Sequence, residues 1–183
     1  HMLEEKETNP EKKELLHHVG RASKQLLELI NGILEFDKFS QQESPVLFKK
    51  FDVQELISNV IDIEYPAARS KNLELIFKCA PNMPEILVGD NTRLYRILLN
   101  LISNAVKFTP KGFVKIIAQV AQEIDQKKIL LKFEIQDTGI GIPADKQNII
   151  YERFKRCTPS NQGLYPGSGL GLSIVRQLVT DLE

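Results

Sequence analysis

The stretch Asn91–Thr109, NTRLYRILLNLISNAVKFT, predicts a buried helix whose apolar face carries two side-chain amides. Apolar residues recur at spacings of three and four, the pattern of one helix face packed on a core: Leu94, Ile97, Leu98, Leu101, Ile102, Ala105 and Phe108. Asn100 and Asn104 are four residues apart, so they project from the same side of this helix. Because buried amides cost free energy unless they hydrogen-bond or bind a ligand, the pair requires an explanation.

Two explanations are open for these asparagines. Their amide oxygens are suitable ligands for a hard cation such as Mg²⁺, and Lys107, about one turn after Asn104, adds a positive charge that would suit a phosphate. Together these groups fit a nucleotide–magnesium complex. Alternatively, both asparagines cap neighbouring backbone groups, and the helix taken alone favours this second explanation at least as strongly.

The composition is that of one ordinary folded domain with an appendage. The chain has 183 residues, of which 42% are hydrophobic, and 24 basic residues balance 24 acidic ones, so no basic field favours nucleic acid or an anionic membrane. The two cysteines indicate reduced thiols in a cytosolic setting, and we find neither a signal peptide nor an apolar run of about 20 residues. Residues 1–8 are expected to be a disordered N-terminus that begins with a tag remnant, His1-Met2.

Residues 9–40 predict a long amphipathic helix. Asn9 suits the N-cap and Pro10 the first helical position. Apolar residues then alternate at spacings of four and three: Leu15, Val19, Ala22, Leu26, Leu29, Ile33 and Phe36. This heptad pattern favours a seam in a helical bundle that a homodimer would complete, and the alternative is a single helix lying on the chain's own domain.

The remaining segments alternate between helix and strand. Residues 41–51 read as a linker, after which Asp52 and Glu55 have the spacing of a capping box and predict a helix that stops near Tyr65, before Pro66. Alternating apolar residues predict strands at 72–79, 113–122 and 129–136, the last two joined by a hairpin around Asp125-Gln126, and 86–88 is a further short apolar segment.

The chemistry-bearing residues gather after the last strand. Asp137-Thr-Gly-Ile-Gly-Ile-Pro143 places a carboxylate, which could accept a hydrogen bond from the amine of adenine, beside two glycines that permit close approach to a flat ring. Residues 157–166 lack periodicity and are rich in turn formers, as in a mobile lid. Gly167-Ser-Gly-Leu-Gly-Leu172 then opens a helix whose N-terminal amides would suit phosphate. The chain contains neither G-x-x-x-x-G-K-[ST] nor G-x-G-x-x-G.

In this order, the four motifs resemble the catalytic ATP-binding domain of two-component sensor histidine kinases, within the superfamily of gyrase, heat-shock-chaperone and mismatch-repair ATPases. The N box corresponds to Asn100–Phe108, the G1 box to Asp137–Pro143, the F box to Arg153-Phe154 and the G2 box to Gly167–Leu172. Leu26–Asp37 is similar to the second helix of the family's dimerisation hairpin. The resemblance covers about residues 20–180.

The resemblance implies an α+β fold, a two-layer sandwich with a mixed sheet packed on helices and preceded by the long amphipathic helix. It implies an ATP-binding catalytic domain over residues 52–183 that lacks the last two strands of the family's sheet. ATP and Mg²⁺ would be the cofactors, with Asn104 binding the metal, Asp137 the adenine amine, and Lys107 and Arg153 facing phosphates. The other nucleotide-site positions implied are Phe108, Gly139, Gly141, Phe154, Gly167, Gly169, Leu170, Gly171 and Leu172.

Asn100 and Lys107 are the implied catalytic residues. Hydrolytic relatives carry a glutamate base at the position of Asn100, and an asparagine cannot deprotonate water, so transfer to a protein histidine is favoured. The family's acceptor-histidine helix is not in this chain, and His17-His18 read as ordinary surface or bundle residues, so autophosphorylation is not expected. The implied partners are an acceptor-histidine hairpin, a response-regulator receiver domain and a second copy through residues 9–40. The implied location is the cytoplasm, and the resemblance leaves open whether the parent protein is anchored in a membrane. The alternatives are a conformational ATPase and a non-catalytic scaffold.

Overall fold

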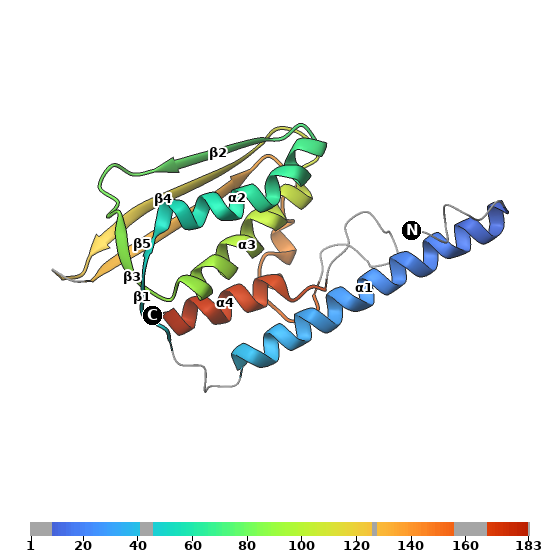
Figure 1. The fold of residues 1–183 in the computed structure, drawn as a ribbon, viewed down its shortest axis with the longest axis horizontal. Helices are drawn as coiled ribbons and strands as arrows, with labels where there is room; N and C mark the ends of the chain where they lie inside the picture. The colour runs from blue at the N-terminus through green and yellow to red at the C-terminus, as the bar shows by residue number, and fades with distance from the viewer. Residues whose placement is uncertain (1–8, 41–45, 126–127, 156–167, 183) are drawn as a thin grey trace.

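The computed structural model describes residues 9–40, 46–125, 128–155 and 168–182, and these form two layers and a protruding helix (Figure 1). One layer is a mixed sheet in the order β2-β4-β5, built from β2 (Glu74–Cys79), β4 (Phe113–Glu123) and β5 (Ile129–Asp137). β2 runs parallel to β4, and β4 runs antiparallel to β5. The second layer consists of helices α2 (Val53–Ser70), α3 (Asn91–Phe108) and α4 (Gly171–Leu182), which confirms the predicted two-layer α+β fold.

The N-terminal helix α1 (Pro10–Ser40) extends beyond the two layers and runs beside α4 (Figure 1). Asn9 is its cap, because its side-chain oxygen accepts hydrogen bonds from the N–H groups of Glu11 and Lys12, as predicted. Several residues of its apolar face are exposed: Leu15, Val19, Ala22, Leu26, Leu27 and Ile30. The side chains of Leu29, Ile33 and Phe36, which continue the predicted seam, lie outside the described residues.

Helix α2 (Val53–Ser70) begins as predicted and ends later. The Asp52 carboxylate accepts hydrogen bonds from the N–H groups of Gln54 and Glu55 at 2.7 and 3.2 Å, the expected cap. The predicted end before Pro66 is wrong, since the helix passes through this proline. Pro66 removes one backbone hydrogen bond but lies on the exposed face of the helix, while Ala68, two residues before the end, is buried and holds the last turn to the core.

A small ribbon was not predicted. β1 (Lys49–Asp52) pairs antiparallel with β3 (Ile86–Gly89), so the last residues of the predicted linker are a strand. The sequence of this strand shows no alternation of apolar and polar residues, because Lys49 and Lys50 are both polar and exposed. Phe51 packs against the core cluster, as does Leu87 of β3. Residues 41–45 of the predicted linker lie outside the described residues.

The main core lies between the sheet and helices α2 and α3. β4 buries Val114, Ile116 and Ala118, and α3 (Asn91–Phe108) covers them with Leu98 and Ile102. A second cluster joins α3 to α4 (Gly171–Leu182), formed by Ile97, Leu101, Leu170, Ile174, Val175 and Leu178. Helix α3 is therefore buried on two sides, and α4 depends on it for position.

The predicted hairpin between the two long strands is confirmed. β4 and β5 pair from Val114↔Asp137 to Glu123↔Ile129, with a bulge between Val120 and Gln122. The side chain of Asp125 accepts the N–H of Lys128 at 2.8 Å, which closes the turn. This pairing brings Asp137, at the end of β5, to the end of the sheet where β4 begins.

Candidate functional site

Helix α3 places Asn100, Asn104 and Lys107 on one face, and all three side chains are half-buried. The amide nitrogen of Asn100 donates a hydrogen bond to the carbonyl oxygen of Arg96 at 3.0 Å. Asn104 forms no side-chain hydrogen bond within the part of the chain that the structure describes. Backbone capping thus explains the nitrogen of Asn100, whereas the Asn104 amide is available to a ligand.

The glycine-rich turn meets this face of α3 directly. A Cβ built on Gly171, the first residue of α4, would lie 2.8 Å from Oδ1 of Asn100 and 3.8 Å from Nδ2 of Asn104. A side chain at position 171 would therefore have to displace the Asn100 amide, whereas the distance to Asn104 is an ordinary contact. Just before it, Leu170 is buried and its carbonyl accepts a hydrogen bond from the Ser173 hydroxyl at 2.8 Å, which anchors the turn. Leu172 is half-buried in the first turn.

The F box supports the opposite side of this turn. The N–H of Phe154 donates to the carbonyl of Gly169 at 3.1 Å. Gly169 has φ +74°, and a Cβ on it would lie 2.9 Å from the carbonyl oxygen of Lys155, so another residue would be both strained and obstructed. The side chains of Phe154 and Arg153 are exposed, and Phe154 adopts φ 61°. Gly167 and the predicted lid lie outside the described residues.

The G1 box packs on the C-terminal end of α3. Asp137 is exposed, and one of its carboxylate oxygens accepts the N–H of Gly139 at 2.8 Å. The N–H of Ile140 donates to the carbonyl of Phe108 at 3.2 Å, and a Cβ on Gly139 would lie 2.6 Å from that same oxygen. Gly141 has φ +68°, with open space around it. The G1 box therefore lies at the end of α3 that carries Phe108.

Lys107 is held at the same end of the helix. Its ammonium lies 4.9 Å from the centroid of the Phe108 ring, within the range of a cation–π interaction. The N box, G1 box and G2 box therefore meet around the C-terminal half of α3, with one exposed carboxylate, two half-buried amides and one ammonium. This group of residues fits a nucleotide, because the carboxylate suits a base amine and the lysine suits a phosphate.

Two residues that support the site were given no role by the sequence analysis: Thr138, which lies inside the G1 box, and Lys71, which lies outside every motif. The Thr138 hydroxyl accepts the N–H of Phe113 at 3.0 Å and donates to the carbonyl of Lys111 at 3.1 Å, which fastens the G1 box to the start of β4. The ammonium of Lys71 lies 2.8 Å and 2.7 Å from the carbonyl oxygens of Val106 and Lys107 and so caps the C-terminus of α3. Their partners are distant in sequence, so no local pattern indicates either role.

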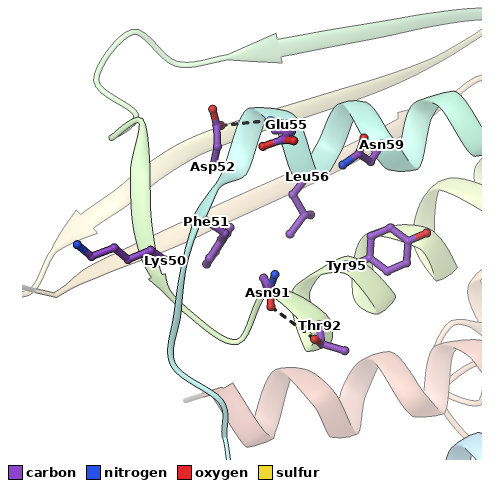
Figure 2. A pocket seen from close by; sticks show the side chains of 9 residues that line it. All are labelled: Lys50, Phe51, Asp52, Glu55, Leu56, Asn59, Asn91, Thr92 and Tyr95. Carbon is purple, nitrogen blue, oxygen red and sulfur yellow. Dashed lines mark hydrogen bonds between the residues drawn. The ribbon is translucent and has the colours of Figure 1, made fainter.

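A separate open cleft of about 480 Å³ lies on another side of α3 (Figure 2). Asn91, Thr92 and Tyr95 contribute from α3, and the other lining residues come from β1 and the N-terminal half of α2: Lys50, Phe51, Asp52, Glu55, Leu56 and Asn59. Asn91 and Tyr95 project from the side of α3 roughly opposite to Asn100 and Asn104. None of the motif residues that the structure describes lines this cleft, so it lies apart from the candidate site.

Comparison with known families identifies the class of protein that this fold and site define. Residues 89–183, just over half of the chain, match the family described as histidine kinase-, DNA gyrase B- and HSP90-like ATPase. The chain belongs to this family. Within the described residues, every helix is too short or too polar to traverse a lipid bilayer.

The individual relatives are histidine kinases. The chain is 35% identical over 176 residues to the hybrid signal transduction histidine kinase K of Dictyostelium discoideum, covering 93% of this chain and 14% of that protein. It is 30% identical to the peroxide stress-activated histidine kinase mak2 of Schizosaccharomyces pombe, covering 97% of this chain and 8% of that protein. The solved structure of full-length ShkA in complex with AMPPNP matches with TM-score 0.72 at 29% identity, over 98% of this chain and 36% of that one. The chain thus spans a small part of its relatives.

Proposed function

We propose that this chain is the ATP-binding catalytic portion of a sensor histidine kinase, which transfers the γ-phosphoryl group of ATP to a histidine. The main observation behind this proposal is that the start of α4, at Gly171, lies close to the side-chain amides of Asn100 and Asn104. The G1 box lies at the end of the same helix, α3. The 30–35% identity to histidine kinases over more than nine-tenths of the chain supports the same reaction. We divide the chain into a dimerisation-type helix at 9–40, a linker at 41–48 and the catalytic domain from 49 to 183, because β1 pairs with β3 and so belongs to the catalytic domain.

Each site residue then has a role that its position supports. The Asp137 carboxylate binds the amine of adenine, Asn104 supplies an oxygen to Mg²⁺, and Lys107 and Arg153 bind phosphate oxygens. No group of three or more His, Cys, Asp or Glu side chains able to hold a metal occurs among the described residues, so the ion would rely on Asn104, phosphate oxygens and water. ATP supplies the phosphoryl group, and Mg²⁺ neutralises charge on its phosphates. Protein residues contribute by positioning and by fixed charge.

Transfer to a protein nucleophile is favoured over hydrolysis by Asn100. Its amide nitrogen is occupied by the Arg96 carbonyl, and its oxygen faces Gly171, so it holds the N box against the G2 turn. An amide has no basic site that removes a proton from water at neutral pH. We infer that the nucleophile is a histidine imidazole, which needs no base when it is neutral.

Helix α1 is the proposed dimerisation surface. Exposed Leu15, Val19 and Leu26 recur at heptad spacing, and a second copy would cover them. The other proposed partners are an acceptor-histidine hairpin and a response-regulator receiver domain, since named relatives are hybrid signal transduction kinases. His17 and His18 are exposed, and His18 lies 3.6 Å from Glu14, an ordinary surface pair. We place the chain in the cytoplasm, where ATP and reduced thiols such as that of Cys79 are found.

A phosphotransfer assay tests this function. The chain is mixed with a separately expressed acceptor hairpin of a related kinase and radiolabelled ATP, and the label is followed on the hairpin. We expect acid-labile label on the hairpin, and none when the acceptor histidine is replaced by glutamine. Steady release of phosphate without label would instead identify a conformational ATPase, and neither product would indicate a non-catalytic scaffold.

A further inference from the structure

A buried group of charged residues lies at the N-terminal end of α3, away from the nucleotide site. Asp90 caps the helix, since its Oδ1 accepts the N–H of Arg93 at 2.9 Å. Its Oδ2 accepts hydrogen bonds from the Arg93 guanidinium at 2.5 Å and from the N–H of Leu47 at 3.1 Å. The side chains of Asp90 and Arg93 are only 3% and 6% exposed. Because a buried ion pair adds little net stability relative to apolar packing, its location calls for another role.

Arg93 also reaches the last turn of α4. Its Nε lies 3.8 Å from Oδ2 of Asp181, whose other carboxylate oxygen accepts a hydrogen bond from the Gln177 side chain at 2.9 Å. The guanidinium therefore joins the first turn of α3 to the last turn of α4. Burial by itself would raise the pKa of Asp90, but the N–H groups of Arg93 and Leu47 and the guanidinium hold that pKa below its usual value, so the group stays charged.

The two ends of α4 are thus attached to one face of α3. Arg93 and Asn100 are seven residues, or about two helical turns, apart on that face. Asp181 contacts Arg93, and Gly171 lies against Asn100, so the helices run antiparallel. Between these contacts the packing is apolar, and burial of apolar surface is non-directional, whereas an ion pair joins one position of α3 to one position of α4. A shift of α4 along α3 would move Gly171 relative to the two asparagines.

We propose that Arg93 is a positioning residue for the nucleotide site, which binds Asp181 to fix α4 along α3 and thereby holds Gly171 against Asn100. Removing this ion pair leaves the apolar contacts in place but allows the start of α4 to move. The inference rests on the proposed function, because the site it positions is the nucleotide site. It assigns a role to a charged cluster remote from every residue expected to touch ATP.

The test uses Asp181→Asn in the full chain, which removes the charge on α4 and leaves the Asp90–Arg93 pair intact. Asp181→Glu keeps the carboxylate, and Asp62→Asn is the control at an exposed aspartate of α2. Calorimetry with Mg²⁺ and AMPPNP and amide hydrogen exchange are measured on all four proteins. For Asp181→Asn we expect about three- to tenfold weaker binding, the size of a partly buried charge pair. We also expect faster exchange from Ile174 to Leu178 and unchanged exchange in β4 and β5, with Asp181→Glu largely restoring both.

Unchanged binding and unchanged exchange in Asp181→Asn would overturn the proposal, as would faster exchange spread evenly over the chain. Arg93→Lys is a second variant that retains charge beside Asp90 but shortens the reach towards Asp181, and the same two changes are expected from it. If the unaltered chain binds no AMPPNP, the proposed function fails. The exchange of α4 in Asp181→Asn still tests whether the ion pair fixes this helix.

Discussion

At the scale of single residues, the site depends on how closely backbone segments approach one another. Gly139 lies against the carbonyl of Phe108, and Gly171 against the side-chain oxygen of Asn100. The two contacts differ in kind, because a carbonyl in a helix cannot move aside, whereas an asparagine side chain can rotate. Substitution of Gly139 should therefore disturb the fold of the G1 box, and substitution of Gly171 should displace Asn100.

Gly139→Ala is expected to weaken nucleotide binding at least about tenfold and to lower the free energy of unfolding by about 1–3 kcal/mol, the usual cost of forcing a methyl group into filled space. Gly141→Ala is the matched control in the same loop. The φ of +68° at this position costs an alanine about 1–2 kcal/mol, but the added methyl group would have no atom within 4 Å apart from its chain neighbours. Calorimetry and urea unfolding of both variants measure the difference. Because Gly141 also belongs to the implied nucleotide site, stability is the deciding quantity: no loss of unfolding free energy in Gly139→Ala would contradict the packing of Gly139 on α3.

The periodicity of α3 predicted that Asn100 and Asn104 project from one side of the helix, but not whether they bind a ligand, since backbone capping fitted the helix alone at least as well. Asn100 and Asn104 interrupt an apolar stripe, and the structure places both beside Gly171. Thr138 and Lys71 could not be predicted, because Thr138 bonds residues 25 positions or more away and Lys71 bonds carbonyls 35 positions away or more. The residues adjacent to Thr138 and Lys71 in the sequence therefore do not indicate these hydrogen bonds.

At the scale of elements, α3 is capped at both ends by charged side chains. Asp90 accepts the N–H of Arg93 at its start, and the Lys71 ammonium binds carbonyls in its last turn. Both charges oppose the helix dipole and are therefore stabilising. The C-terminal cap matters most for the site, since it lies where Lys107 and Phe108 are found.

Lys71→Met should lower the free energy of unfolding by about 1–2 kcal/mol, because a charged hydrogen-bond donor at partly buried carbonyls is lost. Lys78→Met, at an exposed lysine of β2, is the control and should change it by less than about 0.5 kcal/mol. Urea titrations followed by circular dichroism compare the two. A loss of the same size in both variants would show that Lys71 contributes only general charge.

Asp90 makes stability depend on pH in the acid range. Its pKa is lowered in the folded chain, so the folded state binds protons less readily than the unfolded state, whose aspartate pKa is about 3.9. The stabilisation is complete above that value and is lost as the pH falls through the folded pKa. The difference in unfolding free energy between the unaltered chain and Asp90→Asn should therefore shrink below about pH 4. A difference independent of pH from 7 to 3 would contradict this.

The boundaries of elements were harder to predict than their existence. Pro66 marks a helix end by local rules, yet α2 continues because its proline faces solvent and Ala68 is buried. β1 was not predicted, because a strand of four residues with two lysines has no alternating pattern. Its pairing with β3 stabilises it. Tertiary contacts decided both cases.

At the scale of the whole molecule, α1 leaves exposed leucines that a second copy would cover. The double variant Leu15→Asp/Leu26→Asp should shift the chain towards monomer, since charges at a helical seam must be desolvated on association. Val88→Asp, at an exposed valine of β3, is the control. Analytical ultracentrifugation over a range of concentrations measures the equilibrium, and an unaltered chain that stays monomeric at high concentration would contradict dimerisation through α1.

The most direct measurement is the affinity for ATP, determined by calorimetry with and without Mg²⁺ for the unaltered chain and for Asp137→Ala. We expect the unaltered chain to bind ATP, with higher affinity when Mg²⁺ is present because Asn104 and the phosphates share the ion. We expect Asp137→Ala to weaken binding at least about tenfold, since the adenine amine loses its acceptor. No detectable binding by the unaltered chain, or equal binding by Asp137→Ala, would contradict a nucleotide site formed by the N, G1 and G2 boxes.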